Sequence, residues 1–93
     1  MAEASGLQEG QDRLVTEVLR YCATHLVEHT DDVRVTYEPG DRALYRVTVH
    51  EDDTGRIIGR GGRIARALRS VGKAAAAKSG VHAFIRIGDE REY

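Results

Sequence analysis

The chain has 93 residues and a formal net charge of −1, from 14 lysines and arginines against 15 aspartates and glutamates. This length supports one domain with a modest core, which argues against a large enzyme with a deep, enclosed pocket. The sequence has no apolar run near the roughly 20 residues of a membrane-spanning helix. It has no signal-peptide pattern at its start, and its one cysteine, Cys22, excludes an internal disulfide. These features predict a soluble, cytoplasmic protein without membrane contact.

The near-zero net charge conceals a strong segregation of charge along the chain. Residues 1–53 hold twelve acidic and five basic residues, whereas residues 54–88 hold eight basic residues and no acidic one. Such a local excess of cations favours an anionic partner. The alternative is that the charged blocks only keep a small domain soluble.

The first half of the chain predicts a helix followed by a β-hairpin. Residues 1–11 contain two glycines and few apolar residues, so we expect a flexible leader. Apolar residues recur at helical spacing over about 12–29, which predicts an amphipathic helix. From Val33 the apolar period changes to two, and two alternating segments flank Pro39-Gly40-Asp41, a sequence typical of turns. We therefore expect an antiparallel hairpin.

The second half predicts two helices joined by glycines and a final strand. Glu51-Asp52-Asp53-Thr54 offers caps for a short helix, which a glycine-rich segment interrupts within two turns. A longer helix over 63–78 ends before Gly80, where glycine favours a left-handed cap, and an alternating strand follows over 81–87. The domain is expected over 12–89, with a tail at 90–93. The order α-β-β-α-α-β, with three strands and helices on one face, predicts an α+β two-layer sandwich.

The glycine-rich segment between the two helices carries the chemistry. One helix ends and the next begins within four residues, which requires backbone angles that glycine adopts readily. Without side chains at Gly59, Gly61 and Gly62, a sugar–phosphate backbone can approach the main chain. The following helix also offers amide N–H groups and the positive end of its dipole to a phosphate. Mobile positive charge comes from three arginines: Arg56, Arg60 and Arg63. Together these features predict a clamp for an anion.

The helix that follows the loop continues the cationic surface. At about 100° per residue, its polar residues fall within one stripe about 120° wide. The stripe comprises Arg63, Arg66, Arg69, Ser70 and Lys73. A different face is apolar or small and is expected to pack closely against the sheet: Ala65, Leu68, Val71, Gly72 and Ala75. The stripe and the loop share an edge, so a strand of nucleic acid could follow both, although a solvated basic face is the alternative.

The glycine pattern does not fit the two common mononucleotide sites. A P-loop requires a lysine followed by serine or threonine after its glycines, and none follows here. A dinucleotide-binding turn requires a third glycine where this chain has Ile64, and an acidic residue about 20 positions further on, which is also missing. The remaining ligand is a polymer held by its phosphate backbone.

The segment Ile57-Ile58-Gly59-Arg60-Gly61-Gly62, in this order of elements, resembles the GXXG loop of the KH domain, which clamps about four nucleotides. More narrowly, the chain resembles the KhpA (YlqC) family of small bacterial single-KH RNA-binding proteins over residues 21–35, 55–71 and 81–89. The resemblance implies a type II-like KH fold, single-stranded RNA as the ligand, and no catalysis.

The resemblance also assigns roles to individual residues. The clamp would consist of Gly59, Arg60, Gly61 and Gly62. Three apolar residues would line a groove under the bases: Ile57, Ile58 and Leu68. Many KH domains carry a bulky aliphatic residue three positions past the second loop glycine, where this chain has Ala65, which makes the groove shallower. No aromatic residue lies near the loop in sequence, so we expect weak, sequence-tolerant binding without base stacking.

The family further implies homodimers and a heteromer with a KhpB (Jag, EloR)-like protein. That larger partner carries its own KH domain and a second nucleic-acid-binding module, and is linked to cell elongation and division. Two clamps in one dimer could gain roughly 10²–10⁴-fold in affinity if both engage one strand. Leu44 and Phe84 point off the apolar parity of their strands, as ordinary exposed residues or as part of a partner surface.

Other candidate sites have simpler structural explanations. Cys22, His25 and His29 would fall toward one face of the first helix, but Cys22 fits its apolar stripe and a fourth metal ligand is missing. The pair Asp52-Asp53 is explained by helix capping. Two histidines are expected to be exposed, His50 and His82.

The sequence therefore predicts a single-stranded RNA-binding protein, in the role of a dimeric post-transcriptional regulator or RNA chaperone linked to cell elongation and division. The alternative is an interaction module that mainly dimerises with a larger KH-containing partner, with RNA contact secondary. We expect no enzymatic activity, no cofactor, no metal and no small-molecule substrate.

Overall fold

The computed structural model describes residues 2–39 and 43–88, with side chains from residue 13 onward. The helices are α1 (Ala2–Thr24), α2 (Thr54–Ile58) and α3 (Arg63–Lys78), and the strands are β1 (Arg34–Glu38), β2 (Ala43–Thr48) and β3 (Ala83–Ile87). Short 3₁₀ turns lie at Thr30–Asp32, Glu51–Asp53 and Arg60–Gly62. The predicted element order is confirmed. The turn at 40–42 and the tail expected at 90–93 lie outside the described residues.

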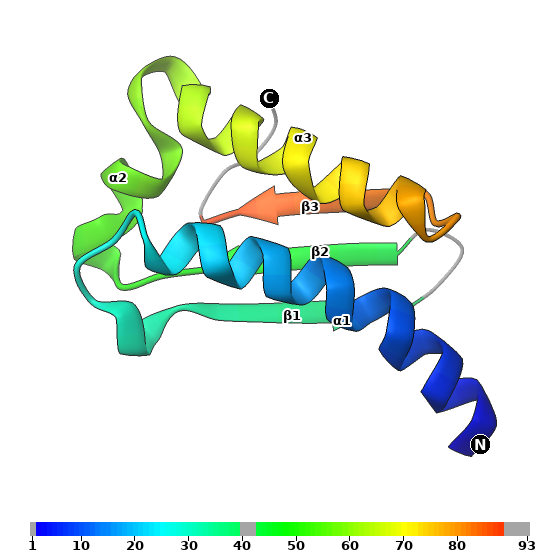
Figure 1. The fold of residues 1–93 in the computed structure, drawn as a ribbon. Coiled ribbons are helices and arrows are strands. Elements are labelled where there is room, and N and C mark those ends of the chain that lie inside the picture. Colours follow the sequence, from blue (N-terminus) through cyan, green and yellow to red (C-terminus); the bar gives the residue numbers. More distant parts are fainter. Residues whose placement is uncertain (1, 40–42, 89–93) are drawn as a thin grey trace.

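The strands form one mixed sheet in the order β1-β2-β3. β1 pairs antiparallel with β2, as the hairpin prediction requires, and β2 pairs parallel with β3. A parallel pair needs a long crossover connection, and this chain uses α2, the glycine loop and α3 for it. Both long helices lie on the same side of the sheet (Figure 1), so the predicted α+β two-layer sandwich is confirmed.

The core lies between the helical layer and the inner face of the sheet. Alternate strand residues point into it, and the inward residues of β2 and β3 are buried. The buried apolar side chains include Val15, Leu19, Ala23, Tyr45, Val47, Ile57, Ala65, Leu68, Ala76, Ile85 and Ile87. None of the helices in the described part of the chain is long and apolar enough to cross a membrane.

Helix α3 packs closely on the sheet through Gly72, as its small residues predict. A Cβ at this position would overlap Cδ1 of Ile85 and would lie 3.1 Å from Cδ2 of Leu19. The placement of Val71 against the sheet was wrong, since its side chain is 42% exposed. Val71 lies about 100° around the helix from Gly72, which turns it toward the gap between α3 and α1.

Helix α1 differs from its prediction at both ends. It begins at Ala2, so residues 2–11, expected as a flexible leader, are helical; their alanines, glutamates and glutamines favour a helix enough to outweigh two glycines. It ends at Thr24 rather than near residue 29, although Val27 remains buried. The His25 ring donates to the carbonyl of Tyr21 at 2.8 Å, and this contact helps to end the helix.

The opposite end of α3 behaves as predicted. Gly80 has a φ of +77°, and its N–H donates to the carbonyl of Ala77 at 2.9 Å while the N–H of Val81 donates to Ala76. This pair of hydrogen bonds is a Schellman motif. It turns the chain directly into β3.

Candidate nucleic-acid interface

The loop between α2 and α3 contains three glycines with positive φ: Gly59 (+79°), Gly61 (+60°) and Gly62 (+79°). The N–H of Gly59 closes α2 on the carbonyl of Gly55 at 2.8 Å, and the N–H of Gly62 donates to Gly59 at 3.1 Å. Residues with a Cβ rarely adopt these backbone angles. The loop therefore has its sharp bend because of the glycines, as the sequence predicts.

The glycines of the loop differ in what surrounds them. A Cβ at Gly59 would lie 2.9 Å from the backbone nitrogen of Ile64, so Gly59 allows the loop to close on the first turn of α3. Apart from Gly61 and its two chain neighbours, no atom of the described residues lies within 4 Å of a Cβ built at Gly61. Gly61 is exposed and Gly62 is buried. The open approach to the backbone is therefore at Gly61.

The start of α3 lies directly behind this open position. Its N-cap residue is Gly62, so no capping side chain covers the amide groups of its first turn. Such amides, together with the helix dipole, attract anions. Arg60 at the loop tip and Arg63 at the first position of α3 are both exposed. Backbone amides and two cations thus surround one open surface.

Arg66 connects the basic stripe to the loop. Its Nη1 donates to the carbonyl of Gly61 at 2.8 Å, so the guanidinium braces the loop from the side. Arg69 is half-buried and Lys73 is exposed along the same flank of α3. The opposite flank faces α1, where Ile64, Ala67 and Val71 line a groove. The structure thus brings the stripe beside the loop, as expected.

Arg56 stands apart from the other predicted cations. Its Nη1 lies 3.2 Å from Oδ1 of Asp53, and its Nη2 lies 3.4 Å from Oε2 of Glu28. Two carboxylates therefore balance its charge and hold it toward the base of α2. The structure does not place Arg56 with the cations of the loop.

The three apolar residues expected under the bases occupy different environments. Ile57 is fully buried and Leu68 is only 4% exposed, so both support the loop from within the core. Ile58 is half-buried and lies near Gly88 at the end of β3. Of the three, Ile58 is the one that offers surface to a ligand.

Asp53 has a structural role that its position in the sequence does not reveal. The sequence predicts a helix cap here, and this prediction is wrong for Asp53, whose side chain makes no capping bond and is fully buried. Its carboxylate accepts hydrogen bonds from the backbone N–H groups of Glu28 (3.1 Å) and His29 (2.9 Å) and from the His29 ring (3.0 Å). It thereby ties the α1–β1 connection to the start of α2. The local sequence does not distinguish Asp53 from its acidic neighbours Glu51 and Asp52, which are exposed.

Hydrogen bonds together shift the pKa values of Asp53 and His29 more than burial does. Burial alone would raise the pKa of Asp53, but the backbone N–H groups of His29 and Glu28, together with the His29 ring, lower that pKa to about 2. The hydrogen bond with Asp53 raises the pKa of His29 above its ordinary value of 6.5, against the opposing effect of burial. Below neutral pH, the Asp53 carboxylate and the protonated His29 ring therefore form an ion pair.

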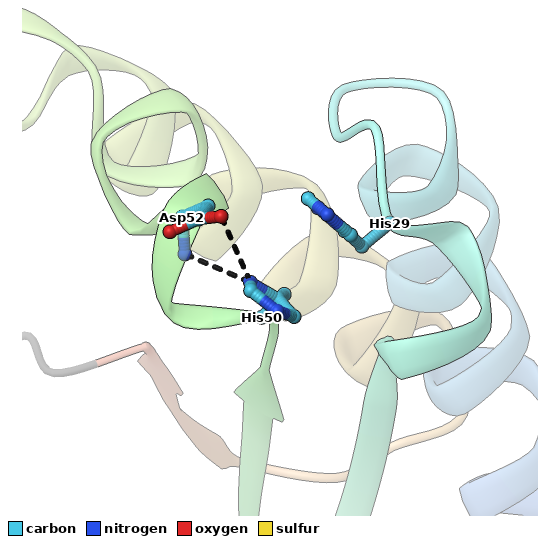
Figure 2. Close-up of side chains that lie close together, drawn as sticks. All are labelled: His29, His50 and Asp52. Atoms are coloured by element: carbon cyan, nitrogen blue, oxygen red, sulfur yellow. Dashed lines mark hydrogen bonds and ion pairs between the residues drawn. The ribbon is translucent and has the colours of Figure 1, made fainter.

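His29, His50 and Asp52 form the one group of three metal-ligand side chains within 4.8 Å in the described part of the chain (Figure 2). The two imidazole rings are stacked, with centroids 4.0 Å apart and planes 13° apart. Ring nitrogens bind metals in the ring plane at about 2.1 Å, and nearly parallel planes at this separation share no such point. His50 also accepts the N–H of Asp52 on Nδ1 at 3.0 Å. The group is a structural brace.

This brace corrects two further expectations. His50 is half-buried and stacked rather than freely exposed. His29 lies beyond the end of α1 and bonds to Asp53. The helical face that would have grouped it with Cys22 and His25 is therefore not formed.

An apolar groove of about 460 Å³ runs between α1 and α3. Its lining residues are Tyr21, Cys22, His25, Leu26, Ile64, Ala67, Leu68 and Val71. Tyr21 is 65% exposed, which is high for an aromatic residue beside a core. A surface of this kind is typical of contact sites.

Comparison with known proteins agrees with this geometry. The family profile described as KhpA/KhpB, KH domain matches residues 16–87. The chain is 39% identical to the RNA-binding protein KhpA of Bacillus subtilis (strain 168) over 69 residues, which cover 73% of this chain and 85% of the relative. It is 47% identical to the RNA-binding protein KhpA of Halalkalibacterium halodurans over 62 residues, covering 66% and 82%.

A third relative, the RNA-binding protein KhpA of Streptomyces coelicolor, is 42% identical over 59 residues, covering 62% of this chain and 75% of the relative. No solved structure matches the chain at a significant level. The profile covers the hairpin, the glycine loop, α3 and the last strand. The chain therefore belongs to the KhpA/KhpB family of KH-domain proteins.

Proposed function

We propose that this protein binds single-stranded RNA by its phosphate backbone at the Gly59–Gly62 loop. The observation that carries the proposal is the open approach at Gly61, bordered by the uncapped first turn of α3 and by exposed Arg60 and Arg63. Backbone amides and a helix N-terminus suit a phosphate. The relatives named RNA-binding proteins support a polynucleotide rather than a small anion.

The residues of the proposed site fall into three roles. Arg60, Gly61 and Arg63 contact phosphates, while Gly59 sets the bend and Gly62, whose N–H donates to Gly59, caps the start of α3. Arg66 holds the loop by its hydrogen bond and adds positive charge, and Arg69 and Lys73 extend the basic stripe along α3. Ile58 lies beneath a base, while Ile57 and Leu68 support the site from the core. Arg56 contributes least, because Asp53 and Glu28 neutralise it.

This site predicts weak binding with little sequence preference. A GXXG loop holds about four nucleotides, and phosphate contacts carry charge rather than base identity. Two clamps in a homodimer, or in a heteromer with a KhpB-like protein, would raise affinity roughly 10²–10⁴-fold on one strand. A dimeric post-transcriptional regulator or RNA chaperone, linked to cell elongation and division, is the role that fits such binding.

The test measures the affinity for a short oligouridine as a function of salt, in wild type and in two variants at Gly61. Gly61→Asp places a negative charge at the open position, whereas Gly61→Asn has nearly the same shape without the charge, and both residues tolerate positive φ. We expect Gly61→Asp to lose at least roughly tenfold in affinity, and Gly61→Asn to retain most binding. Equal affinity of Gly61→Asp and wild type, at unchanged circular dichroism, would contradict the proposal.

A second function, protein–protein interaction with RNA contact secondary, is favoured by the apolar groove between α1 and α3. In that case Gly61→Asp would keep its RNA affinity, and the chain would form dimers that a polar residue in the groove disrupts. The RNA affinity of Gly61→Asp, measured beside the sedimentation of wild type and of the groove variant Val71→Ser, separates the two functions.

A further inference from the structure

The face of the sheet opposite the helices carries a pattern of its own. Both α1 and α3 lie against the other face (Figure 1), and alternate strand residues point away from them. The outward residues of the three strands are Arg34, Thr36, Glu38, Leu44, Arg46, Thr48, Phe84 and Arg86. In β1 and β3 these outward positions are exposed, and in β2 they are half-buried.

Arginines are concentrated on this face. Arg46 and Arg86 are register partners on neighbouring parallel strands, so their backbones lie about 4.8 Å apart. Arg34 pairs with Thr48, two residues along β2 from Arg46. Like charges at adjacent positions in a sheet are destabilising. Within this face, Glu38 lies 3.9 Å from Arg46, and the side chains of Arg46 and Glu38 are 40% and 58% exposed. A bound polyanion would compensate this repulsion.

An exposed aromatic side chain lies next to the arginines. Phe84 is 38% exposed and pairs in register with Leu44, directly beside the Arg46–Arg86 row. Its ring lies 5.7 Å from that of His82 in an edge-to-face contact. An aromatic ring beside arginines offers stacking to a base and charge to its phosphate. The glycine loop has no comparable aromatic residue near it in the sequence.

The arginine face is continuous with the proposed clamp. β3 is an edge strand of the sheet, and α3 lies along it. Since Ile64, Ala67 and Val71 face the α1 groove, the flank with Arg66 and Lys73 faces the β3 edge. Cations therefore continue from the loop, along α3, to Arg86 around that edge.

We infer that the outer face of the sheet is a second contact surface for single-stranded RNA, formed by Arg34, Arg46, Arg86 and Phe84. This inference rests on the proposed function, because the same strand is held first at the glycine loop. RNA of about four nucleotides occupies the loop alone. A longer strand passes the β3 edge and contacts the arginines with its phosphates and Phe84 with a base.

The experiment compares oligouridines of about four and about 16 nucleotides on the full chain. The test variant is Arg46→Gln with Arg86→Gln. The matched control is Arg13→Gln with Arg20→Gln, which removes two exposed charges from α1 in the helical layer. Circular dichroism and sedimentation establish that fold and oligomeric state are the same in all three proteins.

We expect the sheet variant to bind the short RNA like wild type and to bind the long RNA about tenfold more weakly, with a salt slope lower by about 1.4. The control variant should still bind the long RNA more tightly than the short RNA, as wild type does. Phe84→Ala should weaken only the long RNA, by a few-fold. In NMR titrations, long RNA should shift the amides of Arg46 and Phe84, whereas short RNA should shift only the loop.

Three results overturn the inference. The sheet variant could retain the affinity and salt slope of wild type for long RNA, or the control variant could lose as much, which would indicate general electrostatics. The sheet variant could instead change the oligomeric state with RNA affinity intact, which would make this face a protein interface. If wild type binds neither RNA, the proposed function itself fails, a result distinct from failure of the sheet variant alone.

Discussion

The two flanks of α3 are opposite in character although they belong to one helix. The flank toward the β3 edge carries Arg66 and Lys73 and leads to the open glycine loop. The flank toward α1 lines an apolar groove with Ile64 and Val71. Between them, Gly72 packs against the sheet. One helix thus separates a cationic flank from an apolar flank, because side chains three or four positions apart share a flank.

The largest expected effect comes from disrupting the close packing of Gly72, which lies between the two flanks of α3. Gly72→Val places atoms where Ile85 and Leu19 already lie, so we expect the free energy of unfolding to fall by about 1–3 kcal/mol. Urea denaturation followed by circular dichroism measures it. The control is Gly55→Ala, at a helical position where the described residues leave open space. It should be neutral or stabilising by up to about 1 kcal/mol, and an equal loss there would disprove the packing argument.

On the cationic flank, Arg66 should matter more than Lys73. Arg66→Met removes a charge and also the 2.8 Å hydrogen bond to Gly61, whereas Lys73→Met removes only a charge. We expect the RNA affinity to fall roughly tenfold in the first variant and roughly threefold in the second. Fluorescence anisotropy at fixed salt measures both. Equal losses would mean that Arg66 acts through charge alone.

On the apolar flank, Val71→Ser tests the proposed dimer surface. Val71 is 42% exposed, so the monomer should fold normally, while the dimer dissociation constant rises several-fold as apolar contact is lost. Ala74→Ser, at an exposed position of the same helix, should leave dimerisation unchanged. Analytical ultracentrifugation at several concentrations compares them. Both variants should bind a short oligonucleotide with the same affinity. A lower RNA affinity in Val71→Ser would mean that the two flanks of α3 are not independent.

The smallest effect is a pH dependence from the base of α2. Because the pKa of His29 is raised in the folded state, the protonated ring adds to the free energy of unfolding below about pH 6.5. This stabilisation is lost as the pH rises through the raised pKa. The lowered pKa of Asp53, about 2 against an ordinary 3.8, means that its contribution is present above about pH 4 and is lost toward pH 2. Stability should therefore decline slightly from about pH 6 to about pH 8.

Urea midpoints across this pH range measure the decline. His29→Asn removes the titrating ring and should flatten the curve between about pH 6 and pH 8. His25→Asn is the control, because this histidine is exposed, contacts Tyr21 at the end of its own helix and lies away from Asp53. A wild-type slope that persists in His29→Asn would assign the pH dependence to another group.

Local chemistry made the loop region predictable. The bounds of α3, the left-handed cap at Gly80 and the bend at Gly59–Gly62 all depend on glycine angles and helical spacing within a few residues. The length of α1 was less predictable. Its apolar period continues to Val27, but the chain leaves the helix at Thr24 so that the next residues can reach Asp53.

By itself, the sequence determined the order of elements, the two-layer fold and a sharp bend that glycines favour, because these follow from apolar periodicity and from backbone preferences within a few residues. Tertiary structure alone decided which charges are available. Arg56 is neutralised by Glu28, 28 positions away in the sequence, Asp53 is buried under a distant connection, and Arg46 meets Arg86 across strands. Such pairings depend on how separate segments pack, since charges far apart in the chain interact only when folding brings them within a few ångströms.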